Sequence, residues 1–199
     1  FTASEPSDTA GDAPLRPVFS ASDLVKSAQC EFSVLHTADQ KLGRVPRDEQ
    51  VVNDSRARAA ALGEAHEARV LADLVSTYGM WDGERGVYEV EPAAIYTPEA
   101  LKGKHEESLR ALRAGADVVF QASFFDGEFH GRADFLVKQA NGTYRVVDSK
   151  LARTARVTAL LQLAAYADQL SQAGIEVDRQ ASLILGNGVE SLHKLDTIT

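Results

Sequence analysis

The sequence predicts an α/β domain, a mixed β-sheet with an antiparallel three-strand meander, flanked by helices. Two strong hairpin turns, Asp126-Gly127 and Asn141-Gly142, separate β-branched and aromatic runs over 118–150 and indicate the meander. Helical patterns precede and follow these runs, and the apolar run at 181–185 is typical of a short buried strand. This order of elements is typical of one sheet covered by helices.

Capping residues and glycines set the expected helix boundaries. A first helix is expected to start at Ser22 or Asp23 and to lead into a polar loop at 41–46. Gly79 and Gly174 are expected to end two of the later helices. The later helices are expected at 56–77, 97–115 and 154–172. A short strand is a candidate at 87–90.

Composition limits the class of protein. The chain has 199 residues, of which 44% are hydrophobic, and a formal net charge of −8. We expect a disordered tail over 1–17 and one domain over 18–199, and the initial Phe indicates a fragment or a processed chain. No apolar run approaches a membrane span, and the acidic charge argues against a broad basic surface for nucleic acid. The single cysteine, Cys30, excludes an internal disulfide and favours a reducing cytoplasm.

Charged residues recur inside the meander, at 131–134 and 147–150. Asp148 and Lys150 are two residues apart on one expected strand, so their side chains share a face. Together with Asp134 on the preceding strand, they could hold a divalent metal and steady an attacking water. The alternative is a surface hairpin with scattered charges. The apolar neighbours favour burial, and buried charges need partners or a metal.

The register of the second hairpin decides whether these acids meet. A two-residue loop at Asn141-Gly142 would set Asp134 opposite Ser149. A three-residue loop over 140–142, with Gly142 in the left-handed conformation, would set Asp134 opposite Asp148. We predict the three-residue loop.

A histidine lies on the apolar row of the long helix. His66 falls between Leu62 and Val70 at four-residue spacing. Gly63 costs the helix about 1 kcal/mol relative to alanine, which suggests that the helix approaches another backbone closely there. Such a histidine is either a hydrogen-bonded core residue or a third metal ligand.

Polar residues also mark the last predicted helix. Thr158, Gln162 and Tyr166 form a row at four-residue spacing on an otherwise apolar helix. This row is either a partly exposed stripe or a support for the metal site. Arg153 and Arg156, at the start of the helix, are either solvated or contact phosphates near the scissile bond.

Four motifs follow one another along the chain and resemble those of the RecB-like branch of the PD-(D/E)XK nuclease superfamily. They are Gly63 with His66, Gly131-x-x-Asp134, Asp148-x-Lys150 and Gln162-x-x-x-Tyr166. The resemblance implies a restriction-endonuclease-like fold. It also implies a set of ligands for Mg²⁺ or Mn²⁺, namely His66, Asp134, Asp148 and the backbone carbonyl of Ser149. Lys150 would orient or activate the water, and Gln162 and Tyr166 would support the site.

The same resemblance implies an activity and partners. The expected activity is metal-dependent hydrolysis of DNA phosphodiester bonds, in repair, recombination or defence, with a helicase in cis or trans. Cys30 occupies the place of the first of four iron–sulfur ligands, and a cluster would need three cysteines beyond Thr199. For this chain alone, a small buried hydrophobe is the preferred role of Cys30. The alternative function is a non-catalytic nucleic-acid-binding or coupling module of the same fold.

Overall fold

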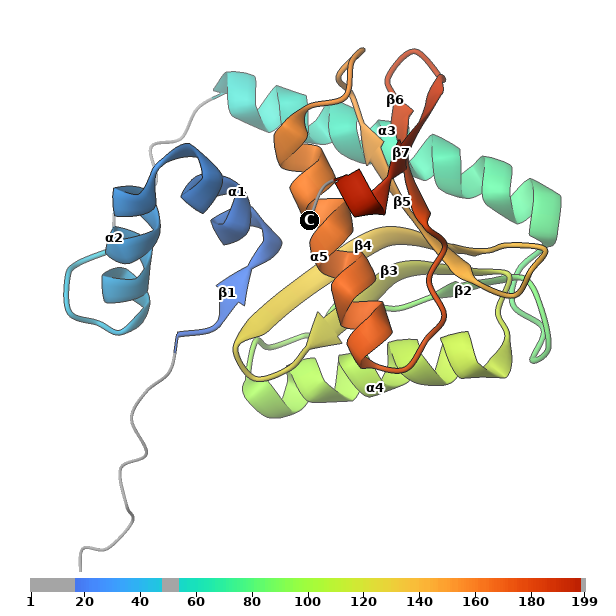
Figure 1. Cartoon of the computed structure of the whole chain (residues 1–199), viewed down its shortest axis with the longest axis horizontal. Helices are drawn as coiled ribbons and strands as arrows, with labels where there is room; N and C mark the ends of the chain where they lie inside the picture. The colour runs from blue at the N-terminus through green and yellow to red at the C-terminus, as the bar shows by residue number, and fades with distance from the viewer. Residues whose placement is uncertain (1–16, 48–53, 198–199) are drawn as a thin grey trace, which may run out of the picture.

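The computed structural model describes residues 17–47 and 54–197, and Figure 1 shows their arrangement. Within these ranges, seven strands form one mixed sheet in the order β2-β3-β4-β5-β6-β7, with β1 paired to β4. The strands are β1 (Phe19–Ser20), β2 (Val87–Glu89), β3 (Val118–Phe125), β4 (Phe129–Lys138), β5 (Tyr144–Lys150), β6 (Gln180–Leu185) and β7 (Glu190–Lys194). The helices are α1 (Ala21–Gln29), α2 (Glu31–Lys41), α3 (Asp54–Tyr78), α4 (Pro98–Ala114) and α5 (Val157–Gln172), with a 3-10 turn at Leu195–Thr197.

The predicted α/β class and the meander are confirmed, since β3, β4 and β5 are consecutive antiparallel neighbours. The predicted boundaries of α4 are also confirmed, because Thr97 caps its first turn and Gly115 ends it at φ 89°. The predicted tail over 1–17 lies outside the described residues except for residue 17. No helix in the described part of the chain is long and apolar enough to cross a membrane.

Several elements near the termini were not predicted. The cap of α1 is Ser20, not Ser22 or Asp23, and its hydroxyl accepts a hydrogen bond from the Asp23 backbone N–H. Helix α2 was not predicted as a separate helix, and its apolar side chains form no buried stripe: Phe32 is 75% exposed. Strands β1 and β7 were also missed, since β1 has two residues and β7 has no buried side chain.

The predicted three-residue loop between β4 and β5 is confirmed. The Gln139 N–H donates to the Thr143 carbonyl at 2.8 Å, and Gly142 has φ 88°. The ladder then runs from Lys138 opposite Tyr144 to Phe135 opposite Val147. In this register, the next pair is Asp134 opposite Asp148.

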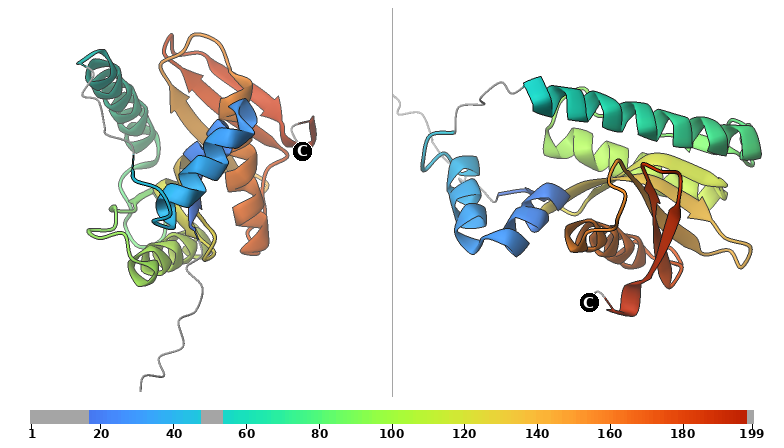
Figure 2. Two further views of the ribbon diagram at one scale, coloured as in Figure 1. Left: turned by 90° about the vertical axis from the view of Figure 1, so that its left-hand side faces the viewer. Right: turned by 90° about the horizontal axis from the view of Figure 1, so that it is seen from above.

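The sheet separates two apolar cores. One contains Val70 of α3 together with Phe120 and Phe135 of the sheet. The other contains Leu112 of α4 and Leu163 of α5. Figures 1 and 2 show α3 and α5 on opposite sides of the sheet. Side chains on both sides therefore reach the strands that carry the acids.

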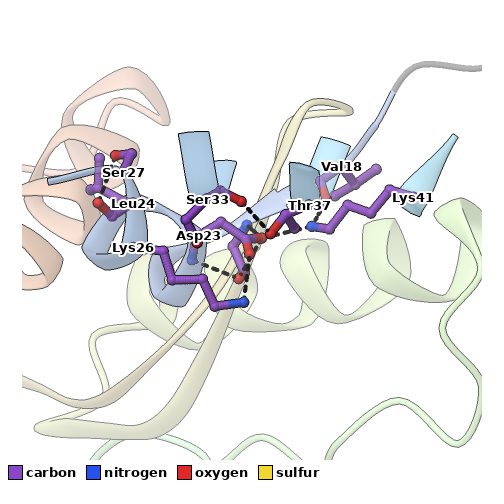
Figure 3. Close-up of polar contacts among 9 residues, drawn as sticks. Val18, Asp23, Leu24, Lys26, Ser27, Ser33, Thr37 and Lys41 are labelled. Atoms are coloured by element: carbon purple, nitrogen blue, oxygen red, sulfur yellow. Dashed lines mark hydrogen bonds and ion pairs between the residues drawn. The ribbon is translucent and has the colours of Figure 1, made fainter. Parts of the chain in front are cut away.

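The N-terminal helices are joined by one buried carboxylate. Asp23 is 5% exposed, and its Oδ2 lies 2.6 Å from the Nζ of Lys41 at the end of α2 (Figure 3). Burial works against the charged form of Asp23, but hydrogen bonds from Lys41 and Ser20 outweigh it and lower the pKa. Lys41 also donates to the Val18 carbonyl. This pair joins α1 to α2, and α1 also packs against α5.

Candidate active site

The acid pair lies where two neighbouring strands separate. The ladder between β4 and β5 ends at Phe135 opposite Val147, one residue before the acids. Further along, β4 pairs instead with β1, with Phe129 opposite Phe19. Beyond the end of the ladder, the backbone groups of β5 on this side can bond to side chains.

Asp134 takes the place of a ladder partner. Its Oδ2 accepts a hydrogen bond from the Ser149 backbone N–H at 2.9 Å and another from the Ser149 hydroxyl at 3.0 Å. Both donors come from a residue with 9% exposure, so the carboxylate is fixed by a rigid strand. The Ser149 carbonyl, predicted as a metal ligand, therefore belongs to a residue in direct contact with Asp134.

Asp148 and Lys150 share a face of β5, as predicted. The Lys150 Nζ lies 2.7 Å from the Asp148 Oδ2. Within the described residues this ammonium is the close partner of the buried Oδ2, and no further hydrogen bond reaches that oxygen. Asp148 is only 4% exposed. Its Oδ2 is therefore buried against a single ammonium.

The electrostatics of this group are strongly coupled. Burial and the nearby charge of Asp134 outweigh the pull of Lys150 and raise the pKa of Asp148 to about 7. Burial disfavours the ammonium of Lys150, but the charges of Asp148, Asp134 and Glu67 outweigh it and raise its pKa. One lysine thus faces two acids, Asp148 in contact with it and Asp134 within electrostatic range, in a largely buried position. A cation would relieve the repulsion between the acids.

Glu67 of α3 is a member of this group that the sequence reasoning missed. Burial and the charge of Asp134 raise the pKa of its carboxyl group, and the charges of Arg132 and Lys150 act in the opposite direction. Its Oε1 accepts a hydrogen bond from the side-chain amide of Gln121. The sequence held a signal that Glu67 lies on the sheet-facing side of α3. Leu71 and Leu74, which follow it at helical spacing, are half-buried.

His66 lies close by but contacts a different group. It is buried, and its Nε2 lies 3.0 Å from the backbone carbonyl of Ile184 on β6. Ile184 pairs with Ser149, one residue from Asp148. The role of His66 as a metal ligand stays a prediction. The close approach expected at Gly63 is wrong, since an added Cβ there would meet no atom within 4 Å.

The residues present fit a hard divalent cation. Mg²⁺ and Mn²⁺ take oxygen ligands, and Asp134, Asp148 and the Ser149 carbonyl supply oxygens side by side. The buried Oδ2 of Asp148, which has a single ammonium as its partner, is the observation that favours this fit. In residues 17–47 and 54–197 no three His, Cys, Asp or Glu side chains form a closed metal-binding group as they stand. Waters would therefore complete the shell of a bound ion.

Helix α5 contributes to the site from the other side. The ring of Tyr166 packs over Gly131, where an added Cβ would lie 2.5 Å from its Cε1. Burial and the charges of Asp148 and Asp134 raise the pKa of Tyr166, which keeps its hydroxyl protonated. The glycine of the predicted Gly-x-x-Asp motif is thus explained by the tyrosine of the Gln-x-x-x-Tyr motif.

A cavity of about 200 Å³ lies beside Lys150. Its lining brings together Lys150, Arg156, Thr158 and Gln162, and it includes Ser22 of α1. Arg153 is exposed and does not line it. The polar row predicted on α5 therefore divides, with Gln162 facing this cavity and Tyr166 packed in the core.

A comparison with protein-family models decides the relationship of the chain. Residues 19–190 match the model of the PD-(D/E)XK nuclease superfamily, and this range holds the whole acid and lysine group. The chain belongs to the PD-(D/E)XK nuclease superfamily. No curated protein matches the chain.

For this member of the superfamily, Cys30 differs from expectation. It is exposed at the junction of α1 and α2, so the preferred role as a small buried hydrophobe is wrong. The chain has one cysteine, and a cluster held by four thiolates cannot form from it alone.

Proposed function

We propose that this chain is a metal-dependent nuclease of the RecB-like branch that hydrolyses DNA phosphodiester bonds. The observation that supports this best is the buried carboxyl group of Asp148, which lies 2.7 Å from the Lys150 ammonium and whose pKa burial and the charge of Asp134 raise to about 7. Asp134, Asp148 and the Ser149 carbonyl would bind the ion. When bound, Mg²⁺ or Mn²⁺ would polarise the scissile phosphate and lower the pKa of the attacking water.

The side chains of the chain would position the reacting groups. The side chain of Lys150 is 37% exposed, so its ammonium can reach a water or a phosphate oxygen at the site. It would orient the water and stabilise charge that develops on the phosphate. The water oxygen would bond to phosphorus while the bond to the 3′ oxygen breaks, leaving a 5′-phosphate and a 3′-hydroxyl.

The cavity beside Lys150 would receive the substrate backbone. Arg156 supplies a cation and Gln162 an amide on its wall, and both can contact phosphate oxygens without reading sequence. Arg153, exposed nearby, would contact a more distant phosphate. We further propose that the nuclease acts with a helicase in cis or trans, in DNA repair, recombination or defence within a reducing cytoplasm.

A cleavage assay tests the proposal. The chain would be incubated with end-labelled single-stranded DNA, duplex DNA and RNA, each with Mg²⁺, Mn²⁺ or EDTA. We expect metal-dependent products with 5′-phosphates from DNA, which are lost in Asp148→Ala and Lys150→Ala. Asp168→Ala, an exposed position on α5, is the matched control. Nucleic-acid binding without cleavage under every condition would instead support the non-catalytic module.

A further inference from the structure

Strand β7 has an open edge. It ends the sheet, and in the part of the chain that the structure describes it pairs with β6 alone. The other end of the sheet is partly covered, because the N–H and C=O of Val87 in β2 bond to Gly79 and Trp81. An open edge presents unpaired backbone groups to which a strand of another chain can bond. A partner strand would therefore be added at β7.

Hydrogen bonds at both ends of β7 show which of its residues face the open edge. The Leu185 N–H donates to the Val189 carbonyl, and the Leu195 N–H donates to the Arg179 carbonyl, each at 2.9 Å. Alternate residues of an antiparallel ladder bond to the partner strand. The odd-numbered residues from 189 to 195 therefore bond to β6. The backbone N–H and C=O groups of residues 190, 192 and 194 point to the open edge.

The side chains of the same three residues share one face of the strand. Glu190, Leu192 and Lys194 are exposed, whereas Ser191 and His193 are half-buried on the other face. Leu192, in the centre, is 51% exposed. The open edge thus carries a large apolar side chain between two side chains of opposite charge.

The order of these charges favours antiparallel pairing of two copies of β7. Charged side chains on an edge strand ordinarily discourage pairing with another chain. Here Glu190 and Lys194 are each two residues from Leu192 and have opposite signs. If two copies pair antiparallel about Leu192, each Glu190 lies opposite Lys194 of the second copy. Parallel pairing in register would instead set like charges beside each other.

We propose that β7 is a dimerisation strand, which pairs antiparallel with β7 of a second copy of this chain about a two-fold axis at Leu192. This register pairs the residues whose backbone groups face the open edge. The two pairs of Glu190 with Lys194 set the direction of the strands, and the two Leu192 side chains meet at the centre. Because one short strand buries little area, the dimer forms only at high protein concentration. The inference does not depend on the nuclease activity.

Charge exchange in the full chain tests this register. Sedimentation velocity at concentrations from micromolar to millimolar should show a monomer that becomes a dimer. Glu190→Lys and Lys194→Glu each set like charges opposite each other twice, so each should weaken association by about tenfold or more. An equimolar mixture of these two variants restores both pairs of opposite charges in a heterodimer, and it should associate about as tightly as wild type. Glu84→Lys, the same change at an exposed position outside the sheet, should associate as wild type does.

A proline variant tests the backbone contact. Leu192→Pro removes the N–H that points to the open edge, a position where edge strands tolerate proline. The dimer should be lost, while the melting temperature stays close to that of wild type. His193→Pro removes an N–H that bonds to β6, so it should lower the melting temperature.

Three results would overturn the inference. The first is a wild-type chain that stays monomeric at every concentration. The second is association of Leu192→Pro, or of either charge variant, at wild-type strength. The third is a mixture of the two charge variants that associates no more tightly than each variant alone. Association is measured without nucleic acid or metal, so these results leave the proposed function untouched, and a failure of the cleavage assay leaves the dimer untouched.

Discussion

Asp134 accepts both hydrogen bonds that Ser149 can donate, from its backbone N–H at 2.9 Å and from its hydroxyl at 3.0 Å. The two residues lie on neighbouring strands at the point where those strands separate. A carboxylate fixed in this way loses little further freedom when it binds an ion, because the strand has already ordered it. The five predictions that follow test the site built around this contact.

Replacing Asp148 by asparagine should separate activity from stability. Cleavage in Mg²⁺ should fall by more than the roughly 10–100-fold that loss of a supporting residue costs, since Asp148 would bind the ion itself. Without metal at pH 8, the free energy of unfolding should rise by about 1–2 kcal/mol, because a buried charge is removed. Urea unfolding in EDTA measures this, with Asp168→Asn as the control. Lower stability than wild type at pH 8 would argue against the like-charge repulsion.

The raised pKa of Asp148 predicts how stability without metal depends on pH. An aspartate in the unfolded chain titrates near 3.8, whereas Asp148 in the folded chain titrates near 7. The unfolded state therefore releases this proton first. The contribution of Asp148 to stability is complete below about pH 4 and is lost as pH rises through 7.

Other groups titrate in the same range, so the comparison with Asp148→Asn isolates this effect. Burial lowers the pKa of His105 and His130, which acts in the opposite direction. Wild type should lose stability relative to Asp148→Asn between pH 4 and 8 in EDTA, and Mg²⁺ should restore it at pH 8. The measurement is the free energy of unfolding in urea at each pH. If this free energy changes with pH in the same way for wild type and Asp148→Asn, Asp148 titrates normally.

Replacing Lys150 by methionine should stop cleavage and preserve metal binding. The ammonium lies 2.7 Å from the Asp148 Oδ2, where it competes electrostatically with a cation. We expect single-turnover cleavage to fall by about 100-fold or more, while Mn²⁺ binds at least as tightly as to wild type. A lysine that only maintained the structure of the site would, on removal, weaken Mn²⁺ binding together with cleavage.

Replacing His66 by alanine tests two roles. Because the ring is buried and its Nε2 lies 3.0 Å from the Ile184 carbonyl, the main expected effect is structural. The free energy of unfolding should fall by about 1–3 kcal/mol, with Mn²⁺ affinity little changed. Leu62→Ala, at an exposed position one turn earlier, is the control. A loss of Mn²⁺ affinity of about tenfold with normal stability would instead support the ligand role predicted from the sequence.

Replacing Gly131 by alanine should disturb the contact between β4 and α5. The new Cβ would lie 2.5 Å from the Cε1 of Tyr166. The expected cost is about 1–3 kcal/mol of unfolding free energy, as for other overpacked cores. Gly103→Ala in α4, where nothing lies within 4 Å, should instead stabilise by up to about 1 kcal/mol. Equal stabilities of the two variants in urea would show that Tyr166 can move away.

The meander and its acid pair could be predicted because each step depends on nearby residues. Gly142 alone can adopt φ 88° cheaply in the loop, and this conformation fixes the register that pairs the strands. Strand alternation then places Asp148 and Lys150 on one face. The sequence could not give the separation of β4 and β5, because that depends on β1, a two-residue strand from far along the chain.

The sequence by itself determined the three strands of the meander, their register and the two acids with their lysine, because turn chemistry and two-residue periodicity are local properties. Only the tertiary structure decided which residue of α3 contacts β6 and which contacts β3. His66 and Glu67 are adjacent on a helix, and a rotation of about 100° about its axis exchanges them. The packing of α3 on the sheet sets that rotation: it directs His66 to the Ile184 carbonyl and Glu67 to Gln121.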